Sequence, residues 1–301
     1  MTARQHAAAA RSASASIGVR PVPGLLDAEF RLFQSLVERE AGIQLADTKR
    51  ALLASRLNQR LRELEMPSFS AYYRRVIDDP NEAIVMLDRL TTNETSFFRE
   101  PSQFAFLETR VFPRWREDAS KGRRPRRIRA WSAGCSTGEE PVSMAMSLLS
   151  HFPRSEGFEI EILASDLSTR VLRQARSATF SLDKAVQIPG HHLHRFMRRG
   201  IGRQAGRMRA SSEVRATLRF ERLNLARDLD PRLGIFDLVL CRNVLIYFEP
   251  THKRGALQRL LRVLDPEGLL LLGHSEALQG REQPLRSVGP SVFAWKKLLD
   301  D

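Results

Sequence analysis

The segment from Ile128 to Leu149 constrains the fold more than any other part of the chain. A short apolar run, Ile128–Trp131, precedes a turn with two glycines and then an apolar stretch long enough for a helix. This order predicts a strand, a turn and a helix, with backbone N–H groups and the positive helix end facing any ligand above the strand. Gly134 and Gly138 permit a positive φ and a close approach of ligand to backbone. A plain turn between a strand and a helix of a parallel sheet is the alternative interpretation.

The residues of this turn restrict the ligand. Glu139 and Glu140 fall in the first helical turn, where negative charge suits the helix but disfavours a bound phosphate. A dinucleotide fold needs three glycines at the one-three-six spacing, whereas this turn has two glycines four positions apart. We therefore expect a nucleoside ligand without a pyrophosphate, and S-adenosylmethionine (SAM) fits that description.

Length and charge set wider limits. The chain has 301 residues, of which 42% are hydrophobic, enough for two domains with a sizeable core. It has no apolar run of about 18 residues and no apolar secretory signal, so we expect a cytoplasmic protein in which Cys135 and Cys241 are free thiols. The net charge of +13 predicts an acidic partner, which can be nucleic acid, an anionic membrane or an acidic protein surface.

The first hundred residues divide into a tail and a helical domain. Residues 1–24 are rich in Ala, Ser and Arg and are expected to be disordered. Residues 25–100 have apolar positions at helical spacing, which predicts a small all-helical domain. Its second helix, at about 47–64, has one basic face, which is either solvated or a docking face for an acidic helix; the face carries Lys49, Arg50, Arg56, Arg60 and Arg62.

The rest of the chain predicts an α/β domain. Residues 101–127 form a linking helix, Ser102–Trp115, and a basic linker at 117–127. In residues 128–301 strands alternate with helices, which predicts a parallel sheet closed by an antiparallel edge strand at Ser291–Trp295. At about 178–220 the alternation breaks, and we expect an inserted β-subdomain with a basic surface.

Two strand ends carry candidate binding residues. Asp166 follows the second strand, where an acid in this type of fold binds ribose hydroxyls; capping the next helix is its alternative role. The strand Phe236–Cys241 ends in Arg242 and Asn243.

Five motifs in order give a family resemblance. They are Thr91-Thr-Asn-Glu-Thr-Ser-Phe-Phe-Arg99, Ser132-Ala-Gly-Cys-Ser-Thr-Gly-Glu-Glu-Pro141, Ala164-Ser-Asp166, Leu223-Asn-Leu225 and Cys241-Arg-Asn-Val-Leu-Ile-Tyr-Phe248. Together they resemble the CheR-type chemotaxis protein methyltransferases over about residues 25–297. The resemblance implies a Rossmann-like SAM-dependent methyltransferase domain with an inserted small β-subdomain, preceded by a small all-helical N-terminal domain that docks on the receptor.

The resemblance also implies an activity and partners. The enzyme would methylate glutamate side chains on methyl-accepting chemotaxis receptors, giving glutamyl methyl esters and S-adenosylhomocysteine (SAH), for adaptation and without a metal. Its partner would be the acidic cytoplasmic helices of the receptor, with no specific nucleic acid and no membrane insertion, and a monomer is expected. Whether the β-subdomain also binds a receptor C-terminal peptide is left open.

The family's site residues map onto this chain by motif. Arg99 and Tyr247 would flank the transferred methyl group. The receptor-facing basic helix would match Lys49, Arg56 and Arg62. The cofactor contacts would fall on Asn93, Thr95, Arg99, Glu139, Asp166, Asn224, Leu225, Arg242 and Asn243.

The chemistry needs no general base, since a glutamate with a pKa of about 4.3 is already ionised at neutral pH. Catalysis would be alignment, with Arg99 positioning a carboxylate; a structural ion pair with Glu94 or Glu100 is the alternative for Arg99. A non-catalytic SAM-binding scaffold and a nucleic-acid methyltransferase are the competing functions. A nucleic-acid methyltransferase that acts on amino groups would have prolines where this chain has Arg242-Asn-Val-Leu.

Overall fold

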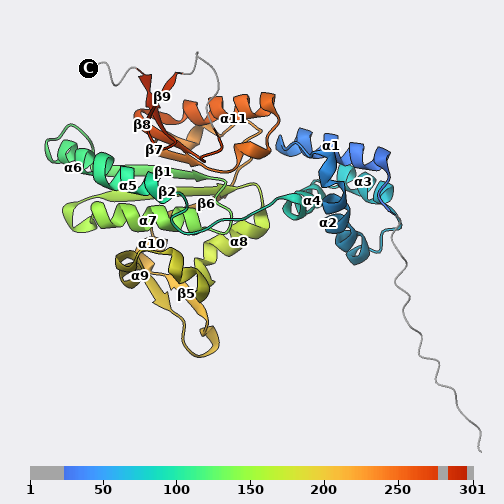
Figure 1. Cartoon of the computed structure of the whole chain (residues 1–301), viewed down its shortest axis with the longest axis horizontal. Helices are drawn as coiled ribbons and strands as arrows, with labels where there is room; N and C mark the ends of the chain where they lie inside the picture. Colours follow the sequence, from blue (N-terminus) through green and yellow to red (C-terminus); the bar gives the residue numbers. More distant parts are fainter. Residues whose placement is uncertain (1–23, 277–283, 297–301) are drawn as a thin grey trace, which may run out of the picture.

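The computed structural model describes residues 24–276 and 284–296, so the expected tail lies almost wholly outside the described residues. Figure 1 shows a group of N-terminal helices beside a sheet covered by helices, with a smaller insertion projecting from the sheet domain.

Capping residues define a boundary of three of the four N-terminal helices. Gly42 closes the first helix with a φ of 69°, and the side chains of Ser68 and Asp79 cap the third and fourth. Phe33, Leu57 and Tyr72 are fully buried in their common core. The helices are α1 (Asp27–Ala41), α2 (Arg50–Glu63, preceded by a 3-10 turn at Asp47–Lys49), α3 (Phe69–Asp78) and α4 (Pro80–Leu90).

The sheet domain is built on seven strands in the order β6-β2-β1-β7-β8-β10-β9. The first five in this order are parallel, and β10 is antiparallel to both its neighbours. The predicted edge strand at Ser291–Trp295 is therefore internal, because the strand that precedes it in the chain, at Leu285–Gly289, forms the edge. The strands are β1 (Arg127–Ala133), β2 (Glu159–Asp166), β6 (Leu218–Arg222), β7 (Phe236–Cys241), β8 (Leu264–Leu272), β9 (Leu285–Gly289) and β10 (Val292–Trp295).

Helices cover both faces of this sheet (Figure 1). On one face, Leu257 and Leu260 of α11 (Pro250–Arg262) belong to the same buried cluster as Trp131. On the other, α7 (Glu139–His151) lies with its apolar residues buried. The chain runs from β1 toward β2 on one side and from β7 toward β8 on the other, so β1 and β7 flank the topological switch point where such folds bind ligands.

The linking helix is longer than predicted and is part of the sheet domain's core. It runs from Pro101 to Ser120 as α5 (Pro101–Phe106), a π-helical turn (Leu107–Val111) and α6 (Phe112–Ser120). Trp115 is buried in the cluster that includes α7, and the guanidinium of Arg124 stacks 4.0 Å from its ring. The predicted basic linker at 117–127 therefore begins as helix and packs on the domain.

The insertion between α8 (Thr169–Ser177) and β6 contains a second, antiparallel sheet in the order β3-β5-β4. Arg198 lies opposite Arg209 on its exposed surface, in agreement with the predicted basic character. Its elements are β3 (Thr179–Ser181), a 3-10 segment (Leu182–Gln187), α9 (Gly190–Phe196), β4 (Met197–Arg199), β5 (Arg207–Ala210) and α10 (Ser212–Arg215).

Candidate active site

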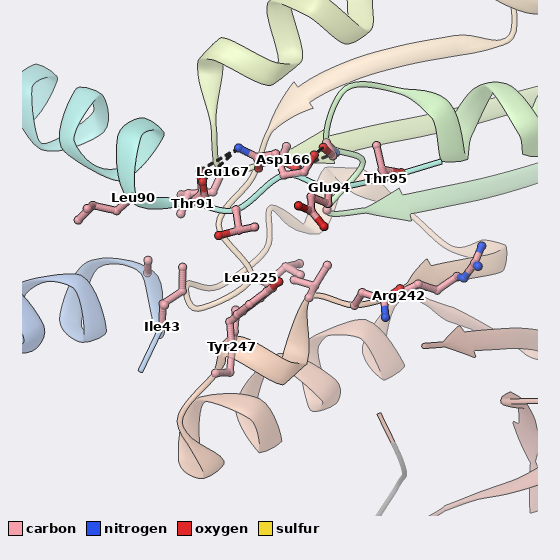
Figure 2. A pocket seen from close by; sticks show the side chains of 18 of the residues that line it. Ile43, Leu90, Thr91, Glu94, Thr95, Asp166, Leu167, Leu225, Arg242 and Tyr247 are labelled. Atoms are coloured by element: carbon pink, nitrogen blue, oxygen red, sulfur yellow. Dashed lines mark hydrogen bonds between the residues drawn. The ribbon is translucent and has the colours of Figure 1, made fainter. Parts of the chain in front are cut away.

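A pocket lies at the carboxyl ends of β1, β2 and β7, and the helical domain forms its opposite wall. Figure 2 shows Asp166 and Glu94 on one side, Tyr247 and Leu225 on the other, and Ile43 from the segment after α1. The two domains meet here through backbone bonds: Gln44 donates to the Tyr247 carbonyl at 2.8 Å, and Glu249 donates to the Gly42 carbonyl at 3.1 Å. The pocket is therefore shared between the domains.

The glycine turn forms as predicted, and a steric constraint explains why its first glycine cannot be another residue. Gly134 has a φ of 90°, and a Cβ added there would lie 2.3 Å from Val244 Cγ2. Only glycine lets the turn after β1 and the loop after β7 come this close. Gly138, with a φ of 99°, stands at the N-cap of α7.

Asp166 lies at the end of β2 and joins three segments of the site. Its Oδ2 accepts a hydrogen bond from Ser136 N at 2.8 Å, and its Oδ1 accepts one from Ser168 N at 2.9 Å. Burial raises the pKa of Asp166, although these backbone bonds oppose the shift. A carboxylate has about four lone-pair sites, so Asp166 keeps acceptor capacity on the pocket that it lines.

The loop from Thr91 to Glu100 crosses the pocket and is held in a strained conformation. Ser136 Oγ donates to the Asn93 carbonyl at 2.8 Å. Phe98 and Glu100 have φ values of 46° and 57°, which L-residues rarely adopt and which cluster at functional sites. The residue between them, Arg99, donates from Nη1 to the Glu94 carbonyl at 3.3 Å, and the ion pair with Glu94 or Glu100, the alternative role for Arg99, is not among those in the described ranges. Asn93, Thr95 and Arg99 all line the pocket.

The guanidinium of Arg242 lies buried at the pocket, between two carboxylates. Arg242 is 3.4 Å from both the Glu100 and the Glu140 carboxylates and also donates to the Arg99 carbonyl. Burial raises the pKa of Glu140, with Arg242 acting in the opposite direction.

The structure places Glu139 outside this pocket. Its carboxylate pairs with Lys184 of the insertion and accepts a hydrogen bond from Thr137 Oγ1 at 2.6 Å. Glu140 lines the pocket instead. Adjacent helical residues point about 100° apart, so only one of the two acids can face the ligand, and the sequence motif alone does not say which.

Asn224 and Leu225 both line the pocket, but Asn224 already has partners. Its Nδ2 donates to the Glu40 carbonyl at the end of α1, at 2.6 Å, and its Oδ1 accepts from Ala226 N at 2.9 Å. The side-chain amide therefore joins the two domains at the wall of the pocket, and its direct contact with the ligand stays a prediction.

The loop after β7 presents Asn243 and Tyr247 to the pocket. Asn243 has a φ of 59°, and its Oδ1 is buried without a hydrogen-bond partner among the described residues. Tyr247 is 41% exposed, and its side chain points toward the middle of the pocket (Figure 2). One residue that organises this loop, Glu276, was not predicted; its sequence signal is only an acid shortly after the next strand.

The three basic residues predicted on α2 and before it have different surroundings, and their role in receptor docking stays a prediction. Lys49 lines the pocket. Arg56 turns inward and donates to the carbonyls of Leu90 and Thr91. Arg62 is exposed.

The residues present fit SAM. Asp166 offers acceptors for hydroxyl groups, the unpartnered Asn243 Oδ1 needs a donor, and the acids Glu94 and Glu140 suit a ligand that carries positive charge. Within the described chain, the potential metal ligands that converge are Glu38, Glu249 and His252, with ligand atoms within 4.8 Å of one another. None of these three lines the pocket.

A doubly wound sheet with a pocket at its switch point and an acid after the second strand is typical of Rossmann-like domains that bind nucleoside-containing ligands. The chain belongs to the CheR methyltransferase family. The family model for the CheR methyltransferase SAM-binding domain matches residues 93–293, and that for the CheR methyltransferase all-alpha domain matches residues 28–91. The resemblance seen in the sequence and the predicted fold class are thus confirmed.

Two curated relatives are similar to this protein over nearly the whole chain. Chemotaxis protein methyltransferase 2 of Pseudomonas aeruginosa is 36% identical over 266 residues, 88% of this chain and 92% of the relative. The chemotaxis protein methyltransferase of Escherichia coli is 36% identical over 275 residues, 91% of this chain and 92% of the relative. No helix in residues 24–276 or 284–296 combines the length and the apolar character that crossing a membrane requires.

Proposed function

We propose that the protein transfers the methyl group of SAM to glutamate side chains on the acidic cytoplasmic helices of methyl-accepting chemotaxis receptors. The observation that carries this proposal is that one pocket is lined by both acidic and basic side chains. Glu140 and Asp166 line it, and so do Lys49, Arg99 and Tyr247. The acids suit a cationic cofactor, and the basic side chains suit an acidic substrate.

The chemistry follows from the charge of the substrate. Bound SAM supplies an electrophilic methyl group on a sulfonium, whose departure leaves a neutral thioether. A glutamate with a pKa of about 4.3 is ionised at neutral pH, so its oxygen attacks without losing a proton to a base. The protein has to align the carboxylate with the methyl carbon, which contributes up to roughly 7–11 kcal/mol in favourable intramolecular cases.

Arg99 and Tyr247 are the residues we propose for this alignment. Within residues 24–276 and 284–296, the Arg99 guanidinium has a single 3.3 Å bond, to a backbone carbonyl, so it can attract the incoming carboxylate. The phenol of Tyr247 points into the pocket from the side opposite Asp166 (Figure 2). Asp166 would bind the ribose hydroxyls of SAM, and Asn243 Oδ1 would accept from one of its donors. Arg242 would hold Glu100, Glu140 and the Arg99 carbonyl in place.

The test is methyl transfer from labelled SAM to receptor-containing membranes, followed by mild alkali. A glutamyl ester releases volatile labelled methanol, whereas an N-methyl group does not. We expect methanol release by the wild-type protein and a loss of turnover in Arg99→Ala and Tyr247→Phe without loss of folding. SAM binding without transfer to any receptor-containing membrane would instead favour the scaffold function.

A further inference from the structure

The loop that follows β7 is held by a single buried carboxylate from the end of the neighbouring strand. We infer that Glu276 is a positioning residue for methyl transfer, which fixes the backbone that carries Asn243 and Tyr247. This inference rests on the proposed function. Glu276 lies four residues after β8 ends, is 1% exposed and does not line the pocket itself.

Four backbone N–H groups converge on this carboxylate. Its Oε2 accepts from Asn243 N and from Gly273 N, each at 2.7 Å. Its Oε1 accepts from Val244 N at 2.8 Å and from Ile246 N at 3.2 Å. Burying a carboxylate is unfavourable unless it is hydrogen-bonded, and here both oxygens are bonded twice.

These bonds fix a loop that regular structure does not hold. Asn243 has the left-handed φ of 59°, and the turn at Leu245–Tyr247 is a single 3-10 turn. An N–H group at such a turn has no helical partner, so a side chain must accept its bond. Glu276 accepts hydrogen bonds from three backbone N–H groups of this loop, those of Asn243, Val244 and Ile246. It therefore sets where Asn243 and the Tyr247 ring stand relative to the pocket.

The pairing of β7 with β8 explains how Glu276 reaches the loop that follows β7. β7 and β8 are parallel neighbours, with Cys241 paired to Leu272, so the segments that leave these two residues begin side by side. Gly273 leaves no room for another atom: a Cβ there would lie 2.8 Å from Glu276 Oε2 and 3.0 Å from Asn243 N. The carboxylate thus joins the ends of two strands across a space that glycine keeps open.

The first variant is Glu276→Gln, which keeps the shape but replaces one acceptor oxygen by an N–H₂ donor. Two of the four backbone donors would then face another donor. Loss of hydrogen bonds to a charged group predicts a fall in turnover of about 10- to 100-fold and a several-fold weaker SAH affinity by calorimetry. Glu249→Gln is the matched control, since Glu249 also accepts backbone bonds, from Thr251 and His252, but caps α11. It should leave SAH affinity unchanged.

A double-mutant cycle separates positioning from general stability. If Glu276 acts through Tyr247, Glu276→Gln should lower turnover far less in a Tyr247→Phe background than in the wild type. Equal effects in both backgrounds would mean that Glu276 is structural only, and would overturn the inference. Unchanged turnover and SAH affinity in Glu276→Gln would overturn it as well.

Gly273→Ala provides a second route if Glu276→Gln does not fold. Its Cβ would displace the carboxylate without removing it, so a milder loss of the same kind is expected, again dependent on Tyr247. SAH calorimetry needs no methyl acceptor. Failure of the proposed receptor substrate would therefore appear as absent methanol in the wild type, while the effect of Glu276 on SAH binding would still be measured.

Discussion

Asp88 of the helical domain caps a helix of the sheet domain through Thr169. Its Oδ1 accepts from Thr169 N at 2.8 Å, and its Oδ2 accepts from Thr169 Oγ1 at 2.7 Å and from Arg170 N at 3.2 Å. These are the first N–H groups of α8, which starts three residues after Asp166. The junction between the domains is therefore built directly beside the acid that we assign to the cofactor.

Replacing Asp88 should affect both stability and binding. Asp88→Ala removes a cap and leaves partly buried donors without their acceptor, so we expect a loss of about 1–2 kcal/mol in the free energy of unfolding. We also expect SAH affinity to fall, because α4 leads into the loop at Thr91–Glu100. Asp79→Ala is the control: Asp79 caps α4 within one domain. A similar loss of SAH affinity in both variants would argue against a specific role for the domain junction.

Gly134→Ala should abolish cofactor binding even where the variant still folds, wholly or in part. The added Cβ would overlap Val244, and the φ of 90° is unfavourable for alanine. Either the turn or the loop with Asn243 and Tyr247 must move. Calorimetry with SAH and circular dichroism would be measured together. Gly122→Ala is the control, because it also has a positive φ but no atom within 4 Å of its Cβ; SAH binding retained in Gly134→Ala would contradict the packing argument.

Asp166 should give SAH affinity a pH dependence. Its pKa is raised above the ordinary value of 3.8 by burial, and ribose hydroxyls donate best to the ionised form. Lowering the pH toward the raised pKa therefore protonates Asp166 and weakens binding. In Asp166→Asn we expect weaker binding at neutral pH and loss of this component of the pH dependence. An unchanged affinity in Asp166→Asn at neutral pH would remove Asp166 from the cofactor site.

The sequence predicts the fold well because its strongest signals are local. The glycine turn, the helix periods and Asp166 at the end of a strand need only short segments to be recognised. Contacts across the sheet or between domains are not local. Glu276 meets Asn243 only after two strands pair, and Asn224 meets Glu40 only after the domains dock. Which of Glu139 and Glu140 faces the pocket depends on the direction of their side chains on α7. A shift of one residue in the start of this helix would change that direction, and the sequence does not fix the start so closely.

A buried ionic network in the helical domain should dominate its stability. Glu82, 3% exposed, accepts from Arg60 Nε at 2.8 Å and from Tyr72 Oη at 2.9 Å. Burial raises the pKa of Glu82, but the bonds from Arg60 and Tyr72 outweigh it, so the pKa lies below 4.5. We expect Glu82→Gln to cost about 3 kcal/mol at neutral pH, because it leaves Arg60 without its buried partner.

The sign of the pH effect on Glu82 is fixed by its lowered pKa. Its ionised form is favoured by folding, so its contribution is fully present above about pH 4.5 and is lost as the pH falls through the folded pKa. The difference in unfolding free energy between wild type and Glu82→Gln should therefore shrink in acid. Glu63→Gln, at a side chain that is 37% exposed, should change stability by less than about 1 kcal/mol. Equal effects at both sites would contradict the buried network.

Receptor docking should depend on Arg62 in a way that differs from Arg56. Arg62 is exposed, so Arg62→Glu is expected to raise the KM for receptor-containing membranes several-fold, more at low salt, while SAH affinity stays unchanged. Arg56 donates to the carbonyls of Leu90 and Thr91, so Arg56→Glu should disturb the pocket loop and weaken SAH binding as well. Steady-state kinetics at two salt concentrations and SAH calorimetry distinguish the two effects. A loss of SAH affinity in Arg62→Glu would show that this face of α2 supports the pocket and is not a separate docking surface.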